Sequence, residues 1–240
     1  MTQQVPLEDN REFKILDILD GRCANTNHTD KIFLVAFMSM GGPLQTDITV
    51  VVKNESILRK AVPPVNQGYG ASIFCGRFTE KAFEQVLLSF QAAGGQFSRY
   101  YLFDFYNPHV NILMDTEILN LKSLYRVDYT DGYAVMITNI NTGEKHLIDL
   151  IYKPKEYLTS LYEASGNLKK SVSGEILPAH ELQPVYSDYF KRYQLTAYQK
   201  ITGVSHHDII GFLITRLNWN GNEFAPVDIC TALLPYKNKH

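Results

Sequence analysis

Two turn signals between segments of β-type composition constrain the fold of this chain most strongly. Asn141-Thr142-Gly143 and Asn220-Gly221 are typical of the tight turns that join antiparallel strands. The flanking segments are 133–140 with 145–151, and 211–219 with 223–233. We therefore expect two β-hairpins, one in the middle and one near the end of the sequence.

Three further segments predict strands. Segment 31–38 is apolar almost throughout, which predicts burial of both of its faces. Segment 47–53 is rich in β-branched residues, and segment 97–106 holds six aromatic residues.

Apolar spacing predicts helices between these strands. One is expected to begin at Thr79 as its N-cap, and the other to run from 185 to 201. Their apolar stripes are Ala82, Phe83, Val86, Leu87 and Phe90, and Tyr186, Tyr189, Phe190, Tyr193 and Ala197. Segments 155–164 and 12–19 are weaker helix candidates. This mixture predicts an α+β fold.

Length and composition bound the function. A chain of 240 residues with 45% hydrophobic residues predicts a single domain over 1–240. A net charge of −2 argues against direct nucleic-acid binding. The longest apolar run, 32–40, is too short to cross a membrane, and the first ten residues lack signal-peptide features. Three widely spaced cysteines fit no disulfide framework, so a reducing cytoplasm is expected.

One enzymatic alternative is a cytoplasmic thiol hydrolase. Cys75 lies just before the predicted helix at Thr79, where a helix dipole would favour a thiolate. His207 could act as its base from a strand, oriented by Asp208 or Asp228. The simpler interpretation is that Cys75 is a small buried apolar residue. We therefore expect no enzymatic activity and no catalytic residues.

No metal or cofactor site is expected from the residues. His206 and His207 are adjacent and would point to opposite faces of a strand, and no CxxC, HExxH or phosphate-loop pattern occurs. The aromatic segment 97–106 instead suits protein contacts, which leaves a non-enzymatic interaction domain as a second alternative. The 15 Tyr and 15 Lys residues would change charge together in strong alkali.

Several segments resemble cypovirus polyhedrins, insect-virus proteins that crystallise around virions inside infected cells. The resemblance rests on Asn10-Arg11-Glu12-Phe13, 31–60, 78–90, 146–166 with Pro154-Lys155-Glu156-Tyr157 and Ser160-Leu161, and 189–198. Lys14-Ile15-Leu16-Asp17 departs from the family, which has an Arg-rich run there.

This resemblance implies an antiparallel β-sandwich core with several helices, including an N-terminal helix or projecting arm over about 1–20. It further implies homotrimers packed into a crystal lattice, in the cytoplasm of an infected host cell. The function would be a self-assembling matrix of viral occlusion bodies, which embeds and protects virus particles and dissolves in alkali. The expected partners are the chain itself and virus particles, with no membrane. Some polyhedrins hold a nucleotide between subunits, at a site that is unknown here. The expected lattice contacts are Arg11, Phe13, Tyr100, Tyr106, Tyr189 and Tyr193.

Overall fold

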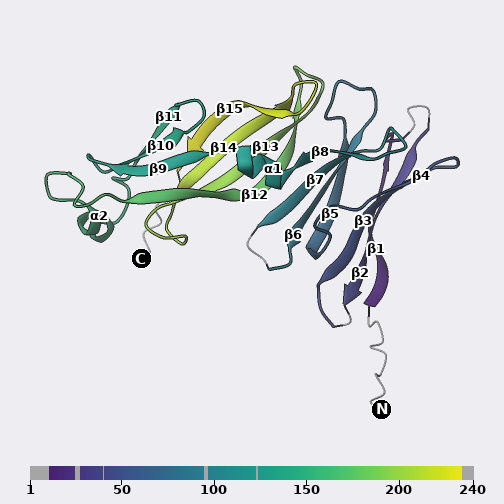
Figure 1. The fold of residues 1–240 in the computed structure, drawn as a ribbon, viewed down its shortest axis with the longest axis horizontal. Coiled ribbons are helices and arrows are strands. Elements are labelled where there is room, and N and C mark those ends of the chain that lie inside the picture. The colour runs from purple at the N-terminus through teal and green to yellow at the C-terminus, as the bar shows by residue number, and fades with distance from the viewer. Residues whose placement is uncertain (1–10, 25–27, 40, 95–96, 123, 234–240) are drawn as a thin grey trace, which may run out of the picture. The chain divides into compact units, whose positions relative to one another are not determined.

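The computed structural model describes residues 11–24, 28–39, 41–94, 97–122 and 124–233 (Figure 1). The chain divides into two compact units, Met1–Asp115 and Thr116–His240, and each is described here by itself. The single domain expected over 1–240 stays a prediction. None of the helices among the described residues is long and apolar enough to span a membrane.

The first unit is one antiparallel sheet of eight strands. Their order is β1-β2-β3-β5-β6-β7-β8, with β4 paired to β3. The strands are β1 (Arg11–Gly21), β2 (Asp30–Ser39), β3 (Gln45–Lys53), β4 (Leu58–Ala61), β5 (Gly68–Gly76), β6 (Gln85–Ala92), β7 (Ser98–Asp104) and β8 (Asn111–Asp115).

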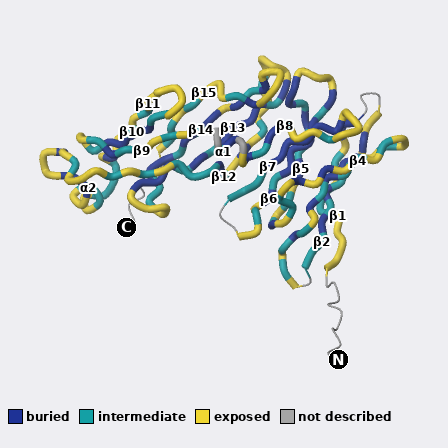
Figure 2. The backbone as a smooth tube through the Cα atoms, in the orientation of Figure 1, coloured by how far each residue is buried: buried dark blue, intermediate teal, exposed yellow. Residues whose placement is uncertain are grey.

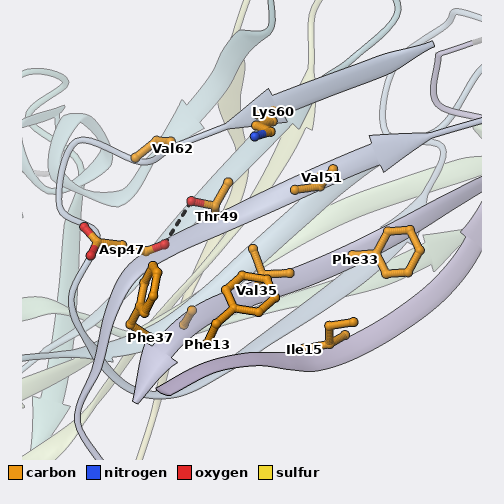
Figure 3. A pocket seen from close by; sticks show the side chains of 11 residues that line it. Phe13, Ile15, Phe33, Val35, Phe37, Asp47, Thr49, Val51, Lys60 and Val62 are labelled. Atoms are coloured by element: carbon orange, nitrogen blue, oxygen red, sulfur yellow. Dashed lines mark hydrogen bonds between the residues drawn. The ribbon is translucent and has the colours of Figure 1, made fainter. Parts of the chain in front are cut away.

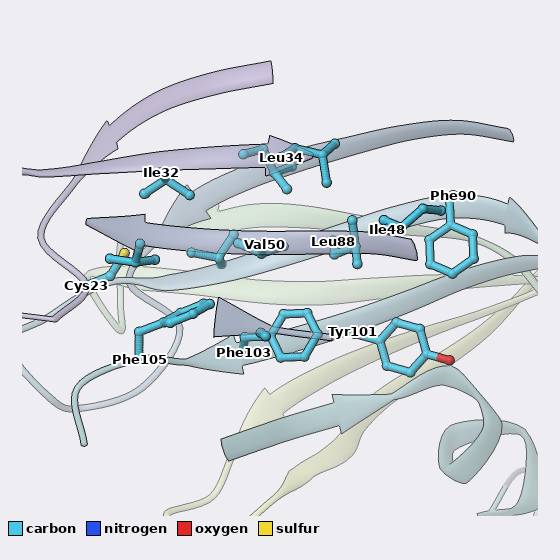
Figure 4. Close-up of a cluster of buried hydrophobic side chains, with 14 of the residues drawn as sticks. Cys23, Ile32, Leu34, Ile48, Val50, Leu88, Phe90, Tyr101, Phe103 and Phe105 are labelled. Atoms are coloured by element: carbon cyan, nitrogen blue, oxygen red, sulfur yellow. The ribbon is translucent and has the colours of Figure 1, made fainter. Parts of the chain in front are cut away.

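This sheet folds over so that its two halves enclose one core. Gln45 opposite Gly68 is the single pairing between β3 and β5. Gly68 also lies very close to β6, where a Cβ on it would be 2.1 Å from the carbonyl oxygen of Gln91. Figure 4 shows Ile32, Leu34, Ile48 and Val50 from β2 and β3 facing side chains of β6 and β7. The facing residues are Leu88, Phe90, Tyr101 and Phe103.

The second unit is a seven-stranded antiparallel sheet with two short helices. Its order is β11-β10-β9-β12-β13-β14-β15, and the outermost strands β11 and β15 contact each other. The elements are α1 (Thr116–Lys122), β9 (Tyr125–Thr130), β10 (Ala134–Asn139), β11 (Lys145–Asp149), α2 (Lys155–Leu161), β12 (Ser173–Ser187), β13 (Arg192–Thr202), β14 (Ile209–Trp219) and β15 (Phe224–Ala232). Its buried cluster includes Val135, Ile137, Ile148, Ile201 and Leu213.

All seven segments expected to be strands contain strands. The two hairpins at Asn141-Thr142-Gly143 and Asn220-Gly221 are confirmed as β10 with β11 and β14 with β15. The α+β class is nevertheless wrong, because the described chain is nearly all β with only α1 and α2 as helices. Of the helix candidates, only 155–164 is confirmed, as α2.

The predicted helix at Thr79 is a bend followed by β6. Val86, Leu87, Leu88 and Phe90 are all buried because β6 lies between β5 and β7 and is covered on both faces. A strand buried on both faces has no period-two alternation, so its apolar residues matched a helical spacing by coincidence.

The helix predicted over 185–201 is wrong, because this segment is the end of β12, the turn at 188–191 and most of β13. Tyr186 and Tyr193 face each other across this hairpin, with ring centroids 5.4 Å apart. The turn uses Lys191 at φ 53° instead of the usual glycine, so it has no turn signal in the sequence.

The expected N-terminal helix is also wrong where the structure describes it, because Arg11–Gly21 is strand β1. A β-bulge at Leu16 shifts the register between Ile15 and Asp17. Leu16 and Leu19 therefore both pack against the core, and this spacing of three residues resembles that of a helix. Residues 1–10 of the predicted arm lie outside the described residues.

Candidate functional site

The outer surface of β1, β2 and β3 is an open apolar face. We define the apolar face by its residues Phe13, Ile15, Phe33, Val35, Phe37, Thr49, Val51 and Val62. In Figure 3 these side chains project from the same side of the sheet and line a shallow groove of about 460 Å³. Lys60 and Asp47 complete the lining.

The apolar character of β2 produces this face. Ile32, Leu34 and Ala36 point into the core and are buried, and the intervening residues point outward. The prediction that both faces of 31–38 are buried is wrong for the outer face, where Phe33, Val35 and Phe37 are only partly covered. Such an apolar surface on a sheet is typical of a binding site.

An aromatic and charged cluster lies at one end of the apolar face. The rings of Phe13 and Phe37 meet edge to face, with centroids 5.7 Å apart. The Arg11 guanidinium lies 5.2 Å from the centre of the Phe37 ring and forms an ion pair of 2.9 Å with Asp47. Two of the expected contact residues, Arg11 and Phe13, therefore belong to this surface.

Strand β1 is an edge of the sheet and continues the apolar face to its border. Among the described residues, β1 pairs with β2 alone. Its outward side chains Phe13, Ile15 and Ile18 are 55%, 53% and 51% exposed. In Figure 2 strand β1 is coloured mostly as exposed. An edge strand presents backbone N–H and C=O groups that no neighbouring strand pairs, so β1 combines an apolar surface with groups that could pair with another strand. Within β1 itself, the Ile18 N–H donates to Asp17 Oδ1 at 2.8 Å.

The second unit contains a partly buried polar cluster around Asp208. Its carboxylate accepts hydrogen bonds from Lys153 Nζ at 2.8 Å, Tyr157 OH at 2.6 Å and the Val204 backbone N–H at 3.1 Å. The Tyr129 hydroxyl lies 2.6 Å from that of Tyr157. The cluster thus joins α2 and the segment before it to β9 and the start of β14.

The protonation states of this cluster favour a structural role. Burial alone would raise the pKa of Asp208, but hydrogen bonds from Lys153 and Tyr157 outweigh it and hold the pKa below its usual value. Burial and the hydrogen bond to Asp208 raise the pKa of Tyr157, and burial also raises that of Tyr129. A tyrosine that serves as a base needs a lowered pKa, so these hydroxyls are suited to holding their protons.

The residues of the thiol hydrolase alternative lie in different surroundings. Cys75 is on β5 in the first unit, and its Sγ lies 3.5 Å from Cys23 Sγ. His207 is exposed in a turn before β14, and not on a strand as expected. Asp208 belongs to the polar cluster, and exposed Asp228 pairs with Arg216 at 3.1 Å.

The four tyrosines expected at lattice contacts differ in exposure. Tyr100 is buried on β7 with 8% exposure, so it offers little surface to a partner. Tyr106 is half-exposed and stacks on Phe83 at 4.2 Å. Tyr189 is 87% exposed in the β12–β13 turn, and Tyr193 is partly covered by Tyr186.

Sequence reasoning missed the remainder of the β1 edge, namely Lys14, Ile15, Asp17, Ile18 and Asp20. The alternation of Arg11, Phe13 and Ile15 is a strand signal. The bulge at Leu16 interrupts this alternation and transfers the outward positions to Ile18 and Asp20, so the pattern does not read as one continuous strand.

Comparison with known proteins decides the family. Residues 123–232 match the YybI C-terminal domain. Over 198 residues the chain is 31% identical to the uncharacterized protein YybI of Bacillus subtilis (strain 168). The aligned region covers 81% of this chain and 76% of that protein. The chain belongs to the YybI family. The YybI C-terminal domain falls within the second unit. No solved structure matches the chain significantly.

Membership of the YybI family corrects the expectations that came from the polyhedrin resemblance. The relative is a bacterial protein, so the assignment to cypovirus polyhedrins is wrong. The function as an occlusion-body matrix and the location in an infected host cell are wrong for the same reason. Short motifs such as Asn10-Arg11-Glu12-Phe13 and Pro154-Lys155-Glu156-Tyr157 do not identify a family by themselves.

Proposed function

We propose that the protein is a non-enzymatic association module in which strand β1 pairs with β1 of a second copy. The observation that carries this proposal is the coincidence of an open apolar face with an unpaired strand edge in the described structure. Backbone pairing would add hydrogen bonds, and the apolar side chains at the border would gain cross-strand contacts.

The order of charges along β1 favours a second copy as the partner. Charged residues on an edge strand usually oppose pairing with other chains. In an antiparallel β1–β1 pair with Ile15 opposite the partner's Leu16, Lys14 lies opposite Asp17 of the partner subunit. In the same register Arg11 lies opposite Asp20 of the partner subunit. Twofold symmetry repeats both pairs, so the strand is complementary to itself.

Because of the bulge at Leu16, residues that lie opposite each other in this register point to the same side of the sheet. Phe13 lies before the bulge and Ile18 after it, and both point to the outer side. Pairing therefore places Phe13 beside Ile18 of the partner subunit on the outer side. Without the bulge, residues at these two positions would point to opposite sides of the sheet.

Two features support a non-enzymatic role. The most strongly perturbed titratable groups of the second unit bond to one another and hold helix α2 against the sheet. In the first unit, Cys75 contacts Cys23 and the Glu84 carboxylate, neither of which is the histidine base of a thiol hydrolase.

The expected homotrimer rested on the polyhedrin resemblance, whereas the β1 edge supports a twofold dimer. The expected absence of membrane and nucleic-acid binding stays a prediction.

A charge-reversal cycle on β1 tests the proposal. Lys14→Asp and Asp17→Lys each replace two attractive cross-strand pairs with two repulsive ones, and the double variant restores attraction. Because such pairs contribute about 0.2–1 kcal/mol each, we expect each single variant to weaken the dimer about tenfold. The double variant should recover most of the affinity. Sedimentation equilibrium of the full chain measures the dissociation constants.

The matched control is Lys145→Asp, the same charge change at an exposed position of β11 in the second unit. It should leave the dissociation constant unchanged. A protein that stays monomeric at high concentration, a trimer, or a double variant as weak as the single variants would each contradict pairing through β1.

A further inference from the structure

Two cysteines of the first unit lie side by side although they are 52 residues apart in the sequence. The Sγ atoms of Cys23 and Cys75 are 3.5 Å apart. Cys23 follows β1 and is completely buried, whereas Cys75 on β5 is partly exposed. The backbone is close here too, because a Cβ on Gly21 would lie 2.5 Å from Cys75 Sγ.

The carboxylates of buried Asp30 and partly exposed Glu84, with backbone groups, hold both cysteines in place. Asp30 Oδ2 accepts hydrogen bonds from the backbone N–H groups of Cys23 and Ala24, both at 2.8 Å. Glu84 Oε2 accepts one from Arg22 N–H at 2.7 Å and lies 3.8 Å from Cys75 Sγ. The two thiols are therefore held together by the fold.

We propose that Cys23 and Cys75 are a thiol pair that a low-molecular-weight disulfide oxidises to an intramolecular disulfide. A disulfide bond is about 2.05 Å long, so the sulfur atoms need to approach by only about 1.5 Å, within reach of side-chain rotation. The bond would connect the end of β1 to β5, in the opposite half of the folded sheet. This site does not depend on the proposed β1 pairing.

Exposure decides the order of the two chemical steps. The Cys75 thiolate attacks one sulfur of the small disulfide, forms a mixed disulfide and releases one small thiol, which takes up the Cys75 proton. The Cys23 sulfur then attacks Cys75 Sγ, breaks the mixed disulfide and releases the second small thiol with the Cys23 proton. The two cysteines lose two electrons, and the small disulfide gains them.

Cys23 is suited to the second step only. Its hydrogen bond with Cys75, its burial and the nearby charges of Glu84 and Asp30 raise its pKa, so it stays a thiol while Cys75 is reduced. Once Cys75 is part of the mixed disulfide, its hydrogen bond with Cys23 and its thiolate charge are absent. Two causes of the raised pKa of Cys23 are therefore removed before the second step.

The full chain with Cys230→Ser tests the pair, because this substitution removes the exposed third cysteine of the second unit. The protein is incubated with oxidised glutathione and examined by intact-mass spectrometry and peptide mapping. We expect a loss of about 2 Da and a peptide linked between Cys23 and Cys75. Oxidation should also raise the thermal unfolding temperature, which reduction should reverse.

A second substitution, Cys23→Ala in the same background, separates the two steps. It should stop the reaction at a mixed disulfide on Cys75, with the added mass of one glutathione. Unchanged mass in the Cys230→Ser protein, a stable mixed disulfide there, or cross-linked dimers would each overturn the proposal. The mass measurement tests only the thiol pair, and the dimer dissociation constant tests only β1 pairing. The two proposals can therefore fail separately.

Discussion

Asp30 is fully buried in the first unit, and its carboxylate accepts three hydrogen bonds. Two come from the backbone at Cys23 and Ala24, and the third comes from the Asn54 side chain at 2.7 Å. Asp30→Ala would leave the two backbone N–H groups buried without an acceptor and would remove the partner of the Asn54 side chain. We expect the free energy of unfolding to fall by about 3 kcal/mol or more, measured by urea denaturation with far-UV circular dichroism.

The matched control for Asp30 is Asp228→Ala. Asp228 is an exposed carboxylate with a single ion pair to Arg216, so its loss should cost less than about 1 kcal/mol. Equal effects of the two substitutions would contradict the assigned role of Asp30.

At the scale of single residues, the sequence identified candidate reactive residues but not their partners in the fold. Cys75 and Asp208 stood out as reactive residues, yet their neighbours Cys23 and Tyr157 are 52 and 51 residues away along the chain.

Helix α2 and the neighbouring strands of the second unit depend on the polar cluster around Asp208. Burial raises the pKa of Tyr152 to about 12, and the pKa values of Tyr129 and Tyr157 are also raised. The unfolded chain therefore loses these protons first, near pH 10. Stability is fully present below about pH 10 and falls as the pH rises toward 12.

Tyr157→Phe tests this account of the cluster. At neutral pH it should lower the free energy of unfolding by about 1.5–3 kcal/mol, because it removes a hydrogen bond to a charged carboxylate. Above pH 10 its stability should fall less steeply, since one tyrosine fewer ionises on unfolding. Fluorescence of Trp219, the only tryptophan, reports on this unit. Tyr189→Phe, at an exposed turn position, is the control, and equal slopes for Tyr157→Phe and the wild type would contradict the account.

Elements with clear local signals were predicted correctly, and those without them were not. Asparagine–glycine turns and β-branched runs identified the hairpins and β3. Three segments were mistaken for helices, each for a separate reason. Strand β6 is buried on both faces, β1 contains a bulge, and the β12–β13 turn has no glycine. The first two features depend on tertiary contacts that the local pattern does not encode, and the third leaves the turn without its usual residue.

At the scale of the whole molecule, the chain consists of two β units, of which the second matches the YybI C-terminal domain. The candidate association surface lies on the first unit, outside that match. An all-β fold was within reach of the sequence, but the open edge was not, since an edge is defined by the absence of a neighbouring strand.

Hydrogen exchange at the backbone of β1 tests the proposed self-association most directly. Pairing with a second copy would place hydrogen bonds on the edge of β1 that faces away from β2. In the full chain, we predict that peptides covering β1 exchange more slowly as protein concentration rises from below to above the dimer dissociation constant. Peptides of the β14–β15 hairpin should not change and serve as the internal control. Exchange of β1 that is independent of concentration, in a protein that dimerises, would contradict the account.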